Sequence, residues 1–363
     1  MTTYNNNFYA VIMAGGIGSR FWPRVSTTKY PKQFHDMMGT GETLIQLTYN
    51  RISNIVQPEN ILVLTNESYK DIVKEQLPKI KEDQIVLEPA MRNTAPCILL
   101  AALKIRKMNE DAVMIVAPSD HWITEKDAFL DDINFALQMA SKEDSLITLG
   151  IRPTNPNTGF GYIQFENNAQ EERLQKITRF AEKPTLRNAK KYLEEGNYLW
   201  NAGIFIWRAS FIIDSFSTHL QEMYRLIIDG EKDLNGPNED KFIKENYPQA
   251  QNISIDYGIL EKSDSVYVIP ASFDWDDLGT WGAMYNQLAK DGHKNAVVNA
   301  KLIPENSTGN IVYTHSSKVV VIQGMEDFIV VDDKDVLLIV PREKEQEIKN
   351  IRARVLEKFE DLG

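Results

Sequence analysis

Cysteine is nearly absent from this sequence. Cys97 is the only one among 363 residues, so no disulfide can form within the chain. It lies in an apolar, helix-like stretch, and we expect its thiol to be packed rather than reactive. No apolar run reaches the ~20 residues that a membrane-spanning helix needs. The first ten residues, MTTYNNNFYA, lack the basic start and apolar core of a signal peptide. These absences favour a cytoplasmic protein.

Positive charge is also in short supply. Lys and Arg number 40 against 51 for Asp and Glu, which gives a net charge of −11. This balance argues against nucleic-acid binding, which usually needs a basic face. A nucleotide can still be bound where positive charge is concentrated locally. Hydrophobic content of 43% and charged content of 25% are ordinary for a globular protein large enough for two domains.

The most informative stretch is a short apolar run, Phe8–Ala14, that leads into a glycine-rich turn followed by basic residues. The residues concerned are Gly15, Gly16, Gly18, Arg20, Arg24, Lys29 and Lys32. A buried strand that opens into such a turn lets backbone N–H groups approach an anion closely, because no Cβ blocks the way. The basic side chains can neutralise that anion. We therefore expect a phosphate cradle, with Arg20 and Lys32 facing the ligand rather than the core.

Two familiar phosphate-binding patterns do not fit this turn. A dinucleotide fingerprint, G-x-G-x-x-G, would need glycine at Phe21. A P-loop would need a Lys-Ser or Lys-Thr pair after the last glycine, and none follows. The pattern that remains, G-G-x-G-x-R followed by P-K, is typical of sugar-1-phosphate nucleotidylyltransferases.

Strands and helices alternate along the first part of the chain. Short apolar strands are expected at Ile61–Thr65, Ile85–Glu88, Ala112–Ala117 and Ser145–Gly150, with helical patterns between them. This alternation predicts an α/β fold with a mixed, mostly parallel sheet, in which ligands bind at the carboxyl ends of the strands. From about residue 295 short β-rich runs follow one another, and a charged helix, Glu343–Phe359, closes the chain. We expect a catalytic domain over residues 1–292 and a small β-rich module over 293–363.

Two acidic segments are candidates for holding Mg²⁺. Asp120 directly follows the strand Ala112–Ala117, and Asp276 and Asp277 lie in the segment FDWDDLG. Mg²⁺ typically takes one or two carboxylates together with phosphate oxygens and water. A helix N-cap is the ordinary alternative for Asp120, and a solvated surface pair is the ordinary alternative for the other two. Adjacent residues in an extended segment point opposite ways, so we expect only one of Asp276 and Asp277 to face the metal.

Three further segments suit a sugar phosphate and a nucleotide. In FAEKP, Lys183 offers a charge for a phosphate and Glu182 an acceptor for sugar hydroxyls. Asn201 in WNAGIF and Gly161 in GFGY lie on aromatic strands where a sugar can approach the backbone. The loop Glu88–Pro96 precedes a helix that Asn93 or Thr94 can cap, and it is also expected to lie over a nucleobase.

Together these segments closely resemble the mannose-1-phosphate guanylyltransferases, a branch of the sugar-1-phosphate nucleotidylyltransferases. The resemblance runs in order along almost the whole chain, through AGGIGSRFWP, PKQF, EPAMRNTAP, PSDH, GFGYI, FAEKP, WNAGIF, SIDYGILEK and WDDLG. The family often has Tyr where Phe160 stands and Ser where Ala202 stands, which puts fine sugar contacts in doubt. Some relatives carry a fused isomerase domain, and this chain is expected to be the form without it.

The resemblance implies a fold, a reaction and roles for residues. The fold is the Rossmann-like nucleotide-diphospho-sugar transferase fold, with a left-handed β-helix-like module often used for dimerisation. The reaction converts GTP and α-D-mannose 1-phosphate to GDP-mannose and pyrophosphate, with Mg²⁺ as cofactor. Arg20, Lys32 and Lys183 are expected to be catalytic, Asp120 and Asp277 (the family's D-L-G position) to bind metal, and Gly161, Glu182 and Asn201 to bind sugar. The nucleotide is expected on Ala14, Gly15, Gly16, Gly18, Ser19, Glu88, Asn93, Thr94 and Ser119.

Two other functions stay open at this point. The chain can be a transferase for another sugar phosphate or nucleotide, or a non-catalytic sugar-nucleotide sensor. A regulatory relative is expected to lose cradle or metal residues, and here they are all present, which favours an enzyme. Because the motifs precede residue 292, we also expect that removing residues 295–363 weakens homodimerisation more than it damages the active site.

Overall fold

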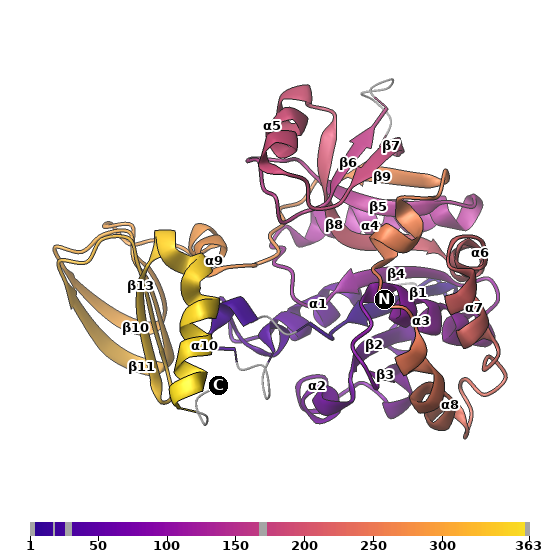
Figure 1. The fold of residues 1–363 in the computed structure, drawn as a ribbon, viewed down its shortest axis with the longest axis horizontal. Helices are drawn as coiled ribbons and strands as arrows, with labels where there is room; N and C mark the ends of the chain where they lie inside the picture. Colours follow the sequence, from indigo (N-terminus) through magenta and orange to yellow (C-terminus); the bar gives the residue numbers. More distant parts are fainter. Residues whose placement is uncertain (1–3, 17–18, 26–30, 167–172, 360–363) are drawn as a thin grey trace. The chain divides into compact units, whose positions relative to one another are not determined.

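The structure is a computed structural model that describes residues 4–16, 19–25, 31–166 and 173–359. By tertiary contact the chain forms two compact units, each assembled from separate stretches of sequence. The first unit contains Met1–Gly15, Tyr49–Ser119 and Ile123–Trp275, and the second contains Gly16–Thr48, Asp120–Trp122 and Asp276–Gly363. Figure 1 labels the helices and strands of both units. The sequence-domain boundary expected between residues 292 and 293 stays a prediction.

A mixed sheet of nine strands organises the first unit, in the order β3-β2-β1-β4-β8-β5-β9-β7-β6. The strands are β1 (Phe8–Met13), β2 (Ile61–Asn66), β3 (Ile85–Glu88), β4 (Val113–Pro118), β5 (Leu146–Ile151), β6 (Tyr162–Phe165), β7 (Gln175–Ala181), β8 (Tyr198–Arg208) and β9 (Val266–Pro270). Parallel pairing joins β3, β2, β1 and β4, as the alternation of strands and helices predicts. Strand β8 runs antiparallel to both β4 and β5. The predicted α/β architecture with a mixed sheet is confirmed.

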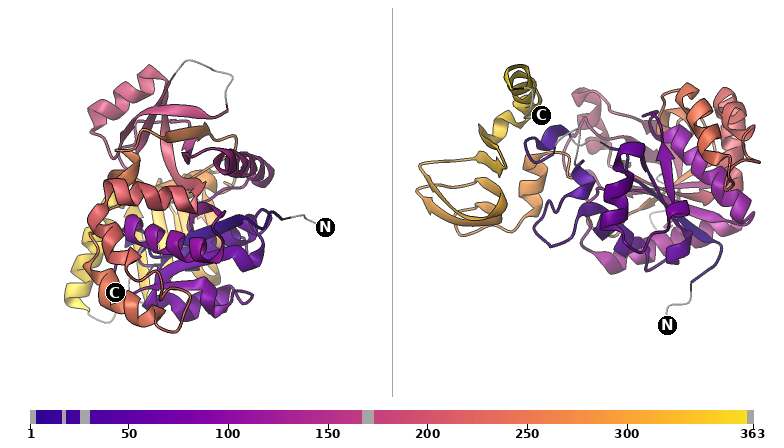
Figure 2. Two further views of the ribbon diagram at one scale, coloured as in Figure 1. Left: turned by 90° about the vertical axis from the view of Figure 1, so that its right-hand side faces the viewer. Right: turned by 90° about the horizontal axis from the view of Figure 1, so that it is seen from below.

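Helices cover this sheet on both sides, as Figure 2 shows. The α-helices that the structure describes in both units are α1 (Leu44–Ile52), α2 (Lys70–Gln76), α3 (Thr94–Met108), α4 (Lys126–Lys142), α5 (Leu186–Glu195), α6 (Ala209–His219), α7 (Gln221–Ile228), α8 (Glu239–Asn246), α9 (Trp281–Gln287) and α10 (Ile348–Lys358). Of these, α9 and α10 belong to the second unit. Helices α3, α6 and α7 pack on one another and share one core with alternate residues of the central strands. Helix α4 packs against β4, β5 and β8. Within the described ranges, no helix combines the length and apolar character that crossing a bilayer requires.

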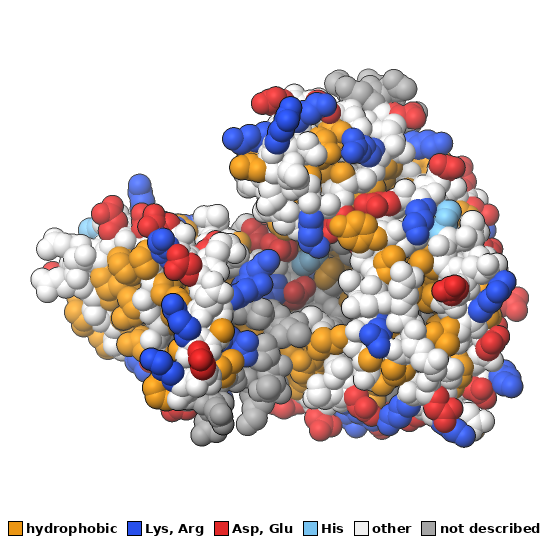
Figure 3. Space-filling view, viewed as in Figure 1, with side chains coloured by type: hydrophobic (Ala, Val, Ile, Leu, Met, Phe, Trp, Pro, Cys, Tyr) orange, Lys and Arg blue, Asp and Glu red, His pale blue; other side chains and the backbone are white. Residues whose placement is uncertain are grey.

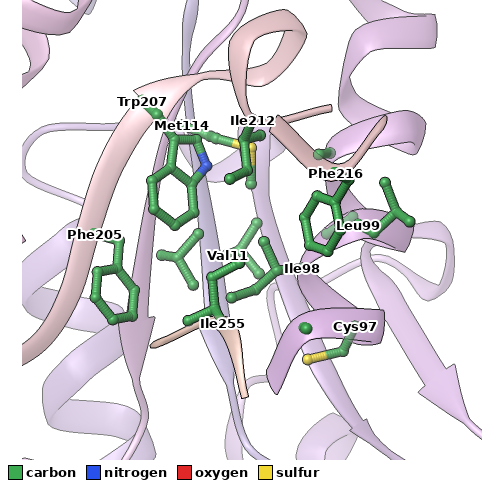
Figure 4. Packing of buried hydrophobic residues seen from close by; sticks show 14 of the residues in the cluster. Val11, Cys97, Ile98, Leu99, Met114, Phe205, Trp207, Ile212, Phe216 and Ile255 are labelled. Carbon is green, nitrogen blue, oxygen red and sulfur yellow. The ribbon is translucent and has the colours of Figure 1, made fainter. Parts of the chain in front are cut away.

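Cys97 lies in this core, as predicted. It is buried at the amino-terminal end of α3, in one cluster with Ile98, Leu99 and Ile255 (Figure 4). Its Sγ–H donates to the carbonyl of Thr94 at 3.2 Å. Burial raises the pKa of the Cys97 thiol well above its usual value, so the thiol stays protonated and packed.

A smaller sheet of four strands, in the order β10-β11-β12-β13, belongs to the second unit. These strands are β10 (Ala296–Glu305), β11 (Ile311–Gln323), β12 (Phe328–Asp333) and β13 (Val336–Pro341). Strands β10, β11 and β12 pair in parallel, and β12 and β13 pair antiparallel. One face of this sheet packs against α9, α10 and the segment that follows the glycine-rich turn. The expected β-rich module with a terminal helix is confirmed.

Several elements differ from the predicted ones. The β-rich runs expected after residue 295 were expected to be short, but β11 spans 13 residues, because β10 pairs with both of its halves across a register shift. The closing helix begins as a 3₁₀ turn, Arg342–Glu347, before α10. A π-helical turn, Asp256–Leu260, was not predicted either. Helices α6 and α7 are not predicted by the sequence reasoning above.

Candidate functional site

The glycine-rich turn follows β1, as expected. Ala14 is buried, and its N–H donates to the carbonyl of Leu64 at 2.7 Å. Ser119, at the end of the neighbouring β4, is also buried and donates its N–H to Met13 at 3.0 Å. Since both N–H groups are used within the sheet, these two residues position the turn and have no backbone donor left for a nucleotide. Gly15 lies beside Glu88: a Cβ built on this glycine would lie 3.3 Å from Oε1 of the glutamate.

The remaining residues of the turn belong to the second unit. The carbonyl of Gly16 accepts from Nε2 of Gln33 at 3.1 Å. Gly18 lies outside the described residues. A short 3₁₀ helix, Ser19–Phe21, carries Arg20, whose side chain is exposed while Phe21 is buried in the core.

A cavity of about 290 Å³ lies in the second unit and brings together four of the predicted residues. Its lining includes Arg20, Lys32, Asp120 and Asp277, which come from three separate stretches of the chain. The remaining lining residues are Phe21, His121, Leu278, Gly279 and Lys349. Two cations and two carboxylates predicted from separate motifs therefore share one cavity.

Lys32 differs from its expected environment. Its residue is only 4% exposed, so the side chain does not simply face a ligand. The ammonium Nζ lies 3.0 Å from Oδ2 of Asp120. It also donates to the backbone carbonyls of Asp277 at 2.5 Å and Leu278 at 3.1 Å. Lys32 thus lines the cavity, as expected, but as a buried side chain that joins the Asp120 and Asp277 segments.

The two predicted metal-binding carboxylates have opposite pKa shifts. Burial raises the pKa of Asp120, but the charge of Lys32, aided by His121 and the Lys32 hydrogen bond, outweighs it and lowers the pKa overall. Burial raises the pKa of Asp277, and the negative charges of Asp276 and Asp120 add to this against the opposing charge of Lys32. Asp120 and Asp277 are thus close enough to repel each other electrostatically.

Asp276 is engaged elsewhere. Its Oδ1 accepts from the N–H of Leu278 at 2.7 Å, and its Oδ2 accepts from Nε2 of Gln287 at 3.0 Å. Both oxygens therefore have protein donors, and the residue does not line the cavity. This arrangement favours Asp277 over Asp276 as the residue that faces a ligand.

The donor set of the cavity fits Mg²⁺ with phosphate and does not fit a cage built from protein alone. Among the described residues, no three His, Cys, Asp or Glu side chains come together in a way that could hold a metal ion. Mg²⁺ usually takes only one or two carboxylates and completes its shell with phosphate oxygens and water. Asp120 and Asp277 provide that number, and the ammonium of Lys32 supplies positive charge beside them.

The three predicted sugar-binding residues come together in the first unit. The N–H of Asn201 donates to the carbonyl of Gly161 at 2.8 Å. A Cβ on Gly161 would lie 2.4 Å from Oε2 of Glu182, so a larger residue here would require the Glu182 carboxylate to shift. The Asn201 side chain accepts from Thr148 Oγ1 at 3.0 Å and donates to Oδ1 of Asp256 at 2.8 Å.

Asp256 is a member of this cluster that the sequence reasoning misses. It begins the π-helical turn, an irregularity that is frequent at functional sites. Burial and the charge of Glu182 raise the pKa of Asp256 to about 6. A signal for Asp256 was present in the sequence, because SIDYGILEK is one of the segments that resemble the family. The sequence analysis, however, assigns no role to its aspartate.

Lys183 stands at the edge of the same cluster. Its φ is +46°, and its ammonium lies 3.0 Å from Oε1 of Glu182 with 62% of the side chain exposed. The hydrogen bond that it donates to Glu182 raises the pKa of Lys183, so this lysine is cationic at neutral pH. An exposed cation beside the carboxylate predicted to bind sugar would suit a phosphate attached to that sugar.

The loop after β3 is held by its own hydrogen bonds. Asn93 caps α3, with its side chain accepting from the N–H of Thr94 at 3.0 Å, and Thr94 Oγ1 accepts from the N–H of Ile255 at 2.9 Å. The predicted cap is therefore confirmed at Asn93. Glu88 is buried and its Oε2 accepts from the hydroxyl of Tyr247 at 2.6 Å. Burial raises the pKa of Glu88, against the effect of that hydrogen bond.

Comparison with protein families agrees with this arrangement. The nucleotidyl transferase family matches residues 9–294, and the mannoseP isomerase/GMP-like beta-helix domain matches residues 302–355. The chain is 36% identical over 350 residues to a putative mannose-1-phosphate guanylyltransferase of Vibrio cholerae, covering 95% of this chain and 73% of that protein. It is 35% identical over 362 residues to the mannose-1-phosphate guanylyltransferase of Escherichia coli K12, covering 96% and 74%.

Solved structures show the same fold. A structure from Thermus thermophilus, described as a mannose-1-phosphate geranyltransferase, superposes with a TM-score of 0.85 at 30% identity, covering 96% of this chain and 99% of that one. A structure described as a mannose-6-phosphate isomerase from Helicobacter pylori has a TM-score of 0.61 at 25% identity, covering 74% and 99%. The chain therefore belongs to the nucleotidyl transferase family, in the group that includes the mannose-1-phosphate guanylyltransferases.

Proposed function

We propose that this chain transfers GMP from GTP to α-D-mannose 1-phosphate, giving GDP-mannose and pyrophosphate. The observation that carries the proposal is the cavity in which Arg20, Lys32, Asp120 and Asp277 meet, in a chain of this family. The relatives described as mannose-1-phosphate guanylyltransferases, matched over nearly the whole chain, favour this nucleotide and this sugar. The cytoplasm, which supplies GTP, is the expected compartment.

The chemistry is an in-line displacement at phosphorus. An oxygen of the sugar phosphate attacks the α-phosphorus of GTP, the bond from that phosphorus to the β-phosphate oxygen breaks, and its electron pair leaves with pyrophosphate. No side chain has to act as nucleophile or general base, because the attacking phosphate is already an anion. Catalysis then depends on positioning and on neutralising charge.

The residues of the second unit supply most of that neutralisation. Arg20 is exposed at the cavity and is assigned to the triphosphate oxygens. Lys32 offsets charge that develops on the leaving pyrophosphate, and it also fixes the Asp120 segment. Asp120 and Asp277 would hold Mg²⁺. When bound, this ion neutralises and orients phosphate oxygens of both substrates.

The residues of the first unit are assigned to the sugar and the nucleoside. Glu182 accepts hydrogen bonds from the mannose hydroxyls and the amide nitrogen of Asn201 donates one to them. Gly161 leaves room for the ring, and Lys183 binds the sugar phosphate. Gly15 and Gly16 offer backbone N–H groups to the triphosphate, and Ser19 follows them. Glu88, Asn93 and Thr94 belong to the loop assigned to the base.

A substrate matrix tests the proposal directly. Purified protein with Mg²⁺ is assayed with GTP, ATP, UTP and dTTP against mannose, glucose and N-acetylglucosamine 1-phosphates, and pyrophosphate release is measured. The expected result is the highest kcat/KM for GTP with mannose 1-phosphate. A higher value for another pair would assign the chain to a different sugar-1-phosphate nucleotidylyltransferase. No turnover with any pair, alongside binding of GDP-mannose, would favour a sensor.

We also propose that the chain forms a homodimer through the small sheet of the second unit. Ile303 and Val321 are neighbours on β10 and β11 and are 47% and 61% exposed, and Val319 beside them is 61% exposed. Hydrophobic side chains gather over the strands of this sheet in Figure 3. Sedimentation of wild type and of Val321→Lys would test this, with a dimer expected for the first and a monomer for the second.

A further inference from the structure

The carboxy-terminal helix contributes a side chain to the cavity of the second unit. Lys349, in the first turn of α10, lines the cavity together with Arg20, Lys32, Asp120 and Asp277. Its neighbour Arg20 is carried by the Ser19–Phe21 turn, which packs against α10. A residue far from every motif in the sequence therefore lies at the candidate phosphate site.

The packing of α10 fixes the place of this lysine. Ile348 is 1% exposed and belongs to the same core as Phe21 and Trp281, and Ile351 and Val355 pack against that core. Just before the helix, a carboxylate oxygen of Glu345 accepts from the N–H of Gly282 at 2.8 Å. Apolar contacts on one side and this hydrogen bond on the other hold the first turn of α10 against α9 and the Ser19–Phe21 turn.

The charges of the cavity give Lys349 a role. Without it, the cavity holds two cationic side chains, Arg20 and Lys32, against two carboxylates, Asp120 and Asp277. Lys349 adds a third cationic side chain to this lining. Lys32 is already engaged with Asp120 and two carbonyls. Among the residues that the structure describes, Lys349 has no hydrogen bond or ion pair, so its ammonium is available to a ligand.

We propose that Lys349 binds the β- and γ-phosphates of the nucleoside triphosphate and the pyrophosphate that leaves, which makes the carboxy-terminal helix part of the catalytic site. The inference rests on the proposed function for the identity of the triphosphate. An exposed lysine on a fixed helix is a point charge that suits phosphate oxygens without strict geometry. As the leaving group gains charge, this ammonium stabilises it together with Arg20 and Lys32.

The test uses the full chain and three variants. Lys349→Ala removes the charge, Lys349→Arg keeps it, and Lys344→Ala is the matched control, because Lys344 is an exposed lysine of the preceding turn that pairs with Glu347. KM for GTP, KM for mannose 1-phosphate and the inhibition constant of pyrophosphate are measured with Mg²⁺. We expect Lys349→Ala to raise both KM for GTP and the inhibition constant of pyrophosphate about 10-fold. Both constants should also change less with salt concentration in this variant than in wild type. Lys349→Arg and Lys344→Ala should keep all three constants within about twofold of wild type. Lys349→Ala should also keep its KM for mannose 1-phosphate within about twofold of wild type.

Equilibrium binding separates this proposal from the proposed function. Calorimetric titration of pyrophosphate with Mg²⁺ into wild type and Lys349→Ala requires no turnover, so it reports on Lys349 even if the substrate assignment fails. Weaker binding by Lys349→Ala than by both wild type and Lys344→Ala supports the proposal. Equal pyrophosphate binding by wild type and Lys349→Ala, or an equal loss in Lys344→Ala, would overturn it. Thermal unfolding of each variant confirms that the helix is still packed.

Discussion

Lys32 and Asp120 form an ion pair with a 3.0 Å separation in which the lysine side chain is 6% exposed and the aspartate 31%. The ammonium is therefore the buried partner, and it also donates to two backbone carbonyls of the Asp277–Leu278 segment. Removing the Lys32 side chain would leave these two carbonyls without their donor and Asp120 without its cation. Lys32 is thus a structural cation as well as a candidate catalytic one.

This pair predicts that Lys32→Ala and Arg20→Ala differ in stability but not in their effect on the reaction. Lys32→Ala leaves two carbonyls without a donor and is expected to lose about 2–4 kcal/mol of unfolding free energy. Arg20→Ala, at an exposed position, should change that free energy by less than about 0.5 kcal/mol. Both should lower kcat roughly 10²–10³-fold. Urea denaturation and steady-state kinetics of the two variants check this, and equal unfolding midpoints would contradict it.

The engagement of Asp276 predicts a contrast among three aspartate variants. Asp120→Asn and Asp277→Asn should each abolish most Mg²⁺-dependent transfer, and the double variant should be little worse, because both residues would serve one ion. Asp276→Asn should keep activity, with a small loss of stability from its hydrogen bonds to Leu278 and Gln287. Initial rates over a range of Mg²⁺ concentrations decide between them. Loss of transfer in Asp276→Asn alone would mean that the ligand is one residue earlier.

The buried carboxyl of Asp256 predicts a pH dependence of stability. Its folded pKa of about 6 lies above its ordinary value of 3.8, so the folded state binds the proton more tightly. Stability is therefore lost as pH rises from about 4 to about 6. Asp256→Asn removes this loss, and allowing for solvent screening we expect it to gain up to about 2 kcal/mol at pH 7.5. The gain should vanish at pH 4.

Urea denaturation at several pH values measures this effect, and Asp214→Asn, at an exposed position on α6, is the control for the change of residue type. A gain that is the same at pH 4 and pH 7.5 would show that the proton on Asp256 is not its cause. The same variant should raise KM for the sugar phosphate, because Asp256 holds the amide of Asn201.

Removal of residues 295–363 is now expected to destroy the candidate site, contrary to the expectation from sequence. Ile311, Ile329 and Ile348 share one core with Phe21 and Trp281. Without these partners the Ser19–Phe21 turn and α9 lose most of their packing. Circular dichroism and activity of the truncated chain check this. A folded and fully active truncated protein would contradict it.

Short motifs singled out Gly161, Glu182 and Asn201, which the structure brings together, because each motif carries a local requirement. A Cβ on Gly161 would meet the Glu182 carboxylate, and the side-chain amide of Asn201 bonds to Thr148 and Asp256, so residue type matters at both positions. The burial of Lys32 was not predicted, because it depends on carbonyls of the Asp277 segment, which only tertiary structure brings near. Lys349 carried no signal at all, since a lysine in a charged helix is ordinary. Strand boundaries in the small sheet were missed because pairing with β10, and not local composition, extends β11.

The discontinuous core of the second unit has a consequence for synthesis of the chain. Phe21, Trp22 and Met38 emerge from the ribosome roughly 300 residues before Ile348, an interval of roughly 15–60 s at about 5–20 residues per second. During that time the first unit can complete its sheet, while these apolar side chains still lack their final partners. The early segment is therefore a part of the nascent chain that a chaperone would be expected to protect. Protease digestion of ribosome-bound chains stalled before and after α10 would show protection of this segment only in the longer ones.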